Sequence, residues 1–63
     1  MESDRAELSA LATSLEDLTT RITAMADRFR GTPRGDVADN LYEVERSLLT
    51  AARKLDRVER SMR

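Results

Sequence analysis

The side chains in this sequence that could do chemistry are carboxylates, arginines and hydroxyls. The chain contains 12 aspartates and glutamates but no histidine and no cysteine. It therefore lacks the commonest general base and metal ligand, and it has no thiolate nucleophile. Glu43 and Glu45 are close in sequence, but residues two apart on a helix do not face each other. A carboxylate metal site in a helical bundle uses a Glu-x-x-His pair, which cannot form here. We expect no enzyme activity, no cofactor and no metal.

Basic residues gather in the second half of the chain and could bind an acidic partner, an anionic ligand or nucleic acid. The competing interpretation is a solvated face, on which pairs such as Asp56–Arg60 form along the helix. The net charge of −1 and the presence of only two aromatic residues argue against nucleic acid. The residues of this possible anion-binding face are Arg46, Arg53, Arg57 and Arg60.

The stretch "FRGTPRGDVADN", residues 29–40, contains both glycines and the only proline. Its tripeptide Arg34-Gly35-Asp36 matches an adhesion signal of some extracellular proteins. The segment "GTPRGD" does not fit a phosphate loop, because it follows a predicted helix rather than a strand and lacks the Lys-Ser/Thr ending. The start "MESDRAELSA" has no apolar signal-peptide core, and we expect a cytoplasmic protein. We therefore interpret this stretch as a turn.

The turn chemistry predicts where two helices end and begin. Gly31 can adopt the left-handed conformation that closes a helix. Thr32 followed by Pro33 could start the next helix, and Asp36 is the rival N-cap. Because Gly35 inside a helix would cost about 1 kcal/mol, we favour Asp36 and a loop over residues 31–35.

Apolar residues recur at alternating intervals of three and four in both halves of the chain, which is the heptad pattern of a coiled coil. This spacing predicts helices over residues 3–30 and 36–63. Neither half shows the period of two that a strand requires. The expected hairpin core consists of Leu8, Leu11, Leu15, Leu18, Ile22, Met25 and Phe29 from the first helix, with Val37, Leu41, Val44, Leu48, Ala51, Leu55 and Val58 from the second.

We predict an all-α fold with one domain over residues 1–63, an antiparallel two-helix hairpin. A chain of 63 residues buries a small fraction of its surface and usually needs a staple, a metal or a partner chain. A second stripe of mainly small residues beside the core stripe is the predicted oligomer interface, through which two hairpins would form a four-helix bundle. That interface consists of Ala12, Thr19, Ala26, Ala38, Tyr42, Leu49 and Ala52.

The sequence predicts a non-catalytic, homo-oligomeric helical interaction or scaffold module. A homodimer is the favoured assembly, and another helical protein is the alternative partner. No apolar run reaches membrane-spanning length. Every basic residue except Lys54 is an arginine and alanine is frequent, which suggests a GC-rich bacterial genome. The alternative function is a small regulatory protein that binds an anionic ligand, nucleic acid or a transcription-related partner through the arginine face.

Overall fold

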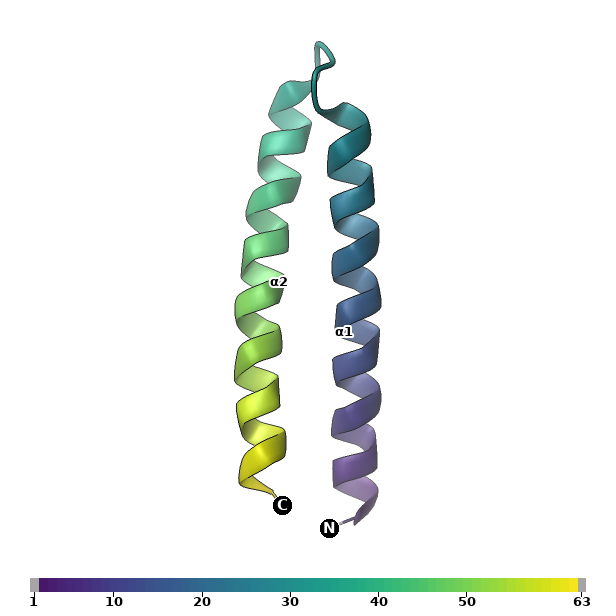
Figure 1. The fold of residues 1–63 in the computed structure, drawn as a ribbon, viewed down its shortest axis with the longest axis vertical. Coiled ribbons are helices and arrows are strands. Elements are labelled where there is room, and N and C mark those ends of the chain that lie inside the picture. Colours follow the sequence, from purple (N-terminus) through teal and green to yellow (C-terminus); the bar gives the residue numbers. More distant parts are fainter. Residues whose placement is uncertain (1, 63) are drawn as a thin grey trace.

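A computed structural model of the chain describes residues 2–62. It contains two α-helices, α1 (Glu2–Phe29) and α2 (Gly35–Ser61). They run antiparallel and side by side, with the loop at one end and both termini at the other (Figure 1). The molecule is a rod 50 Å long, 15 Å wide and 9 Å thick, as measured over its Cα atoms. The predicted all-helical hairpin is confirmed, although residue 63 of the predicted second helix lies outside the described residues.

Both helices are continuous because their interiors contain no proline and consist largely of good helix formers such as alanine, leucine, arginine and glutamate. Ion pairs between residues four apart add small increments on the solvent side, namely Asp17–Arg21 at 3.9 Å and Asp56–Arg60 at 3.0 Å. Neither described helix is long and apolar enough to span a membrane.

The loop closes α1 as the sequence predicts, but it starts α2 differently. Gly31 has φ = 78°, the left-handed conformation that glycine adopts without strain. The Thr32 hydroxyl accepts a hydrogen bond from the Arg34 N–H at 3.1 Å, and the Thr32 carbonyl accepts one from the Gly35 N–H at 3.1 Å. Thr32 thus organises the turn, and α2 begins at Gly35, one residue before the predicted start. Asp36, the favoured N-cap, lies within the first helical turn instead.

The seam between the helices is formed by side chains that are half-buried or buried. In the described part of the chain only Ala26, 0% exposed, and Ala38, 2% exposed, are fully buried. They lie near the loop, where their small size lets the two backbones approach closely. The other seam residues, all half-buried, are Leu8, Ala12, Leu15, Thr19, Ile22, Thr23 and Phe29 on α1, Val37, Leu41, Tyr42, Glu45, Leu48, Ala52, Leu55 and Glu59 on α2, and Met62 at the C-terminal cap of α2.

This seam differs from the predicted hairpin core on one flank of each helix. Six residues that were assigned to the core are exposed: Leu11, Leu18, Met25, Val44, Ala51 and Val58. Six residues assigned to the oligomer interface lie in the seam within one chain: Ala12, Thr19, Ala26, Ala38, Tyr42 and Ala52.

The physical reason for the difference is that each helix carries an apolar stripe broader than one seam. Leu15 and Leu48, near the centre of that stripe, belong to the predicted core and to the observed seam alike. Small side chains on one flank permit a closer approach of the helices than leucine and methionine on the other. Polar groups on the small-residue flank also bond across the seam, as described below.

Candidate functional site

One face of the hairpin carries large exposed apolar side chains from both helices, and we call it the apolar face. Leu11 is 51% exposed, Leu18 44%, and Met25 41%; on α2, Val44 is 43% and Val58 46% exposed. The face consists of these five residues and the exposed Ala51.

Helix geometry places all six residues on the same side of the hairpin. Each lies one residue before a seam position, residues 12, 19 and 26 on α1 and residues 45, 52 and 59 on α2. One residue is a rotation of about 100° around a helix. The two antiparallel helices are related by a two-fold axis perpendicular to the plane that contains both helix axes. A residue that precedes a seam position by one therefore points to the same side of this plane on either helix.

Two hydrogen bonds between the helices determine which residues lie at the same height. The Thr23 hydroxyl donates to a carboxylate oxygen of Glu45, and the Tyr42 hydroxyl donates to the Asp27 carboxylate. In this register the apolar face has three layers, each with one residue from each helix. The layers are Leu11 with Val58, Leu18 with Ala51, and Met25 with Val44.

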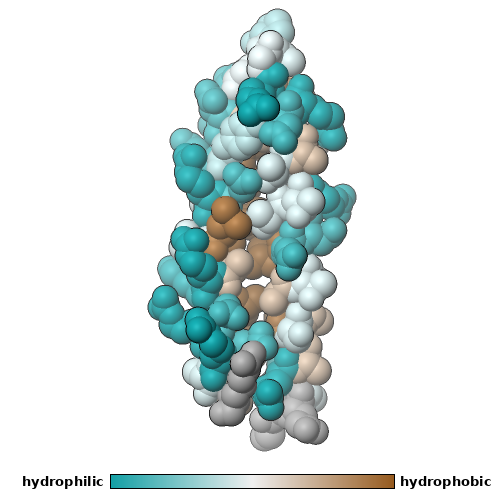
Figure 2. Space-filling model, in the orientation of Figure 1, coloured by the Kyte–Doolittle hydropathy of each residue, from teal (hydrophilic) through white to brown (hydrophobic). Residues whose placement is uncertain are grey.

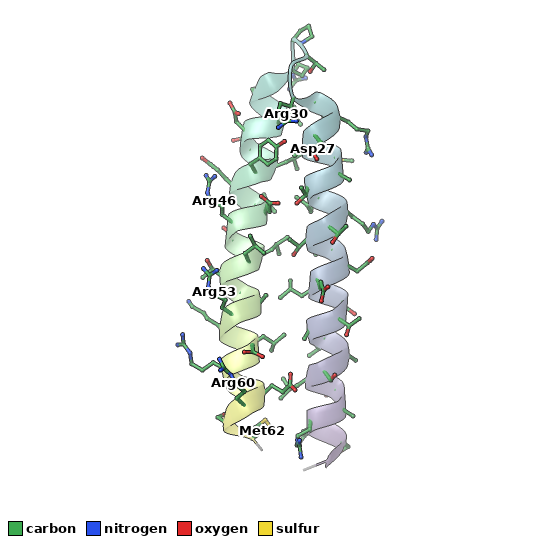
Figure 3. The ribbon with its side chains drawn as sticks, viewed as in Figure 1. Asp27, Arg30, Arg46, Arg53, Arg60 and Met62 are labelled. Carbon is green, nitrogen blue, oxygen red and sulfur yellow. The ribbon has the colours of Figure 1, made fainter. Side chains whose placement is uncertain are left out.

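The opposite face, which we call the polar face, carries these two hydrogen bonds. Asp27 lies on the side of α1 that faces α2 (Figure 3). The hydrogen bond to Asp27 raises the pKa of Tyr42 above its ordinary value, because the phenol proton is held by a carboxylate. Figure 2 shows mostly hydrophilic side chains along the α2 edge and along the upper part of the α1 edge, with more apolar side chains near the centre. Leu49, 44% exposed, also lies on this side, displaced from the seam in the direction opposite to the apolar face.

Sequence reasoning missed both of these hydrogen bonds. These bonds could have been inferred from polar residues on the two helices that lie at the same height beside the seam. That signal becomes usable only when the register is known.

The arginine face lies on the outer side of α2. Arg46 and Arg53 project away from α1 (Figure 3). Arg60 pairs with Asp56 at 3.0 Å, and Arg53 donates a hydrogen bond to the Thr50 hydroxyl at 3.3 Å. A shallow groove beside Leu49 and Ala52 is lined by Arg53, Arg57 and Arg60 together with Asp56. These side chains are exposed and partly satisfied along their own helix, which is the arrangement expected of a solvated face.

The tripeptide in the turn is internally paired. Arg34 donates two hydrogen bonds to Asp36, Nε to Oδ1 at 3.0 Å and Nη2 to Oδ2 at 3.1 Å. This bidentate pair raises the pKa of Arg34 and lowers the pKa of the Asp36 carboxyl. The two charged groups of the tripeptide are bound to each other, as part of the turn.

Among residues 2–62, no group of three or more acidic side chains lies close enough together to hold a metal ion. No protein-family model matches the chain, and no curated protein or solved structure is significantly similar to it. The functional interpretation therefore depends on the faces of the hairpin themselves.

Proposed function

We propose that this protein is a non-catalytic homo-oligomeric interaction module, in which the apolar face binds a second copy of the hairpin and forms a four-helix bundle. The observation that carries this proposal is the apolar face itself. Its five large side chains are each more than 40% exposed, while the described part of the chain fully buries only Ala26 and Ala38. An apolar face of this kind marks an interaction surface, and so short a chain buries little surface by itself and is stabilised by a partner that covers more of it.

The size of the face suits a dimer. The hairpin is 50 Å long and 15 Å wide, so one broad side covers roughly 750 Å². A standard protein–protein interface buries about 800 Å² on each partner. Covering the apolar face would also give the predicted heptad residues Leu11, Leu18 and Met25 an inner position in the bundle, although they lie outside the hairpin seam.

The charge pattern makes a second copy of the chain a suitable occupant. The first half of α2 is mainly acidic, with Asp36, Asp39, Glu43 and Glu45. Its second half is mainly basic, with Arg53, Lys54, Arg57 and Arg60. α1 likewise has Asp4 and Glu7 in its first turns and Arg28 in its last. Antiparallel packing of helices from two copies therefore brings the acidic start of one helix near the basic end of its neighbour, and this long-range attraction favours association although the arginines of α2 lie outside the apolar face.

The change Leu18→Glu tests this function, because it places a charge at the centre of the apolar face. Burying an unpaired carboxylate is costly. We expect sedimentation equilibrium to show a dimer for the wild-type protein and a monomer for the variant at the same concentration. The wild-type melting temperature should also rise with protein concentration, because association stabilises the folded state by mass action.

Leu49→Glu is the matched control. Leu49 is also a leucine in a helix interior and is also 44% exposed, but it lies on the polar side. This variant should remain a dimer. A monomeric wild-type protein with a concentration-independent melting temperature would refute the proposal. Dissociation by Leu49→Glu but not by Leu18→Glu would assign the interface to the other face.

A further inference from the structure

The apolar face also defines how the second copy is oriented. We infer that the two hairpins associate with their loops at the same end, so that α1 of each copy packs against α2 of the other. This inference rests on the proposed self-association through the apolar face. It places the two turns together at one end of the bundle. The helix ends that are far from the turns lie together at the other end.

A two-fold symmetric dimer that uses this face has two simple arrangements. In the first, the symmetry axis runs parallel to the helices, the loops share one end, and α1 lies on α2 of the second copy. In the second, the axis runs across the hairpin, the loops lie at opposite ends, and each helix lies on its own equivalent. Facing helices are antiparallel in both arrangements, so the charge pattern does not separate them, and the sizes of the apolar side chains decide.

The apolar residues of α1 are larger than those of α2 in every layer. With the loops at the same end, each layer packs on the same layer of the second copy. The larger side chain from α1 then lies opposite the smaller side chain from α2. Leu18 then packs on Ala51 of the second copy. Leu11 similarly packs on Val58, and Met25 on Val44. Alternation of large and small side chains across facing positions fills space at the density of a protein interior.

The arrangement with loops at opposite ends distributes these sizes unevenly. Leu18 would face Leu18 and Leu11 would face Met25 along one side of the interface. Ala51 would face Ala51 on the other side. The first side would be overpacked and the second would contain a void, and each defect is destabilising.

Cysteine cross-linking distinguishes the two arrangements, because the chain has no native cysteine. Arg21 lies beside Leu18 and Met25 at the outer edge of the apolar face. Ser47 follows Val44 by three residues and precedes Ala51 by four, so it borders the same face on α2. In the hairpin register, Arg21 and Ser47 lie at the same height. Both are exposed.

The experiment mixes the single variants Arg21→Cys and Ser47→Cys, refolds them together and oxidises them. With the loops at the same end, the two positions face each other along one edge of the bundle, and a disulfide-linked heterodimer is expected. A second variant, Ala51→Cys, is oxidised alone. It should remain unlinked, because its two copies lie on diagonal helices beyond the Cα separation of about 7 Å that a disulfide tolerates.

The outcomes separate this inference from the proposed function. If the variants sediment as dimers and Ala51→Cys links to itself, the loops lie at opposite ends and only the inferred orientation fails. If the dimers form neither disulfide, the inferred layering of the apolar face is refuted. If the wild-type protein and all variants are monomeric, the proposed function itself fails.

Discussion

The two faces of the hairpin differ in whether their side chains have partners within the hairpin. On the polar face, the Thr23–Glu45 and Tyr42–Asp27 hydrogen bonds join the helices, and charged side chains remain in solvent. On the apolar face, no element of residues 2–62 covers the large side chains. The comparison shows that α1 and α2 pack through a central row of apolar residues such as Leu15 and Leu48 and through small and polar residues on one flank, and that they leave the larger apolar residues of the other flank exposed.

The largest effect that tests this comparison is expected at Ala26. The change Ala26→Leu adds volume where the backbones are close and the side chain is fully buried. Overpacking of this kind costs about 1–3 kcal/mol, and we expect that loss in the free energy of unfolding, measured with urea at fixed protein concentration. Ala24→Leu is the matched control at an exposed position of the same helix, where surface changes stay within about 0.5 kcal/mol. Equal effects would contradict the observed seam.

A smaller effect is expected when the polar face loses a hydrogen bond. The change Thr23→Val preserves the shape of the side chain and removes the hydroxyl that donates to Glu45. We expect a loss of about 1 kcal/mol in the free energy of unfolding. Thr13→Val serves as the control, because the Thr13 hydroxyl is exposed and bonds to the Ser9 carbonyl of its own helix, at 3.1 Å. Indistinguishable denaturation curves for the two variants would show that the cross-helix bond contributes nothing.

The titration of Tyr42 tests the same face without a measurement of stability. Tyr42 is the only tyrosine, so tyrosinate absorbance reports its pKa directly. The hydrogen bond to Asp27 raises this pKa in the folded protein, above the ordinary value of about 10. The associated stabilisation is fully present below the unfolded-state pKa and is lost as the pH rises through the folded-state pKa. Asp27→Asn should return the midpoint toward the ordinary value, and an unchanged midpoint would show that the bond does not form in solution.

The smallest effect is expected on the arginine face. Replacement of both Arg53 and Arg57 by glutamine should change the free energy of unfolding by less than about 1 kcal/mol, because exposed charge pairs contribute little. The oligomeric state should also be unchanged, since neither residue belongs to the apolar face. A loss of several kcal/mol, or the release of a bound anion by the double change, would instead support the alternative function as a regulator that binds an anionic partner.

The helices and the turn were predictable because their signals are local. Gly31 closes α1 in the expected conformation, and the observed helix ends fall within one residue of the prediction at Phe29 and at Gly35. The flank that each helix presents to the other was not predictable in the same way. Leu11 and Ala12, like Ala51 and Ala52, are adjacent members of one broad stripe, and the heptad spacing fits either of them.

The sequence by itself determined that this protein forms two amphipathic helices joined by a tight turn, since periodicity, glycine and proline act over a few residues. Only the tertiary structure decided which flank of each stripe forms the seam. A rotation of each helix by about one residue exchanges Leu18 for Thr19 and Val44 for Glu45, and leaves the helices themselves unchanged. The choice depends on the summed contacts of both helices: the close approach at Ala26 and Ala38, and the cross-helix bonds of Thr23 and Tyr42. A pattern within one segment of the sequence does not reveal the total of these contacts between two helices.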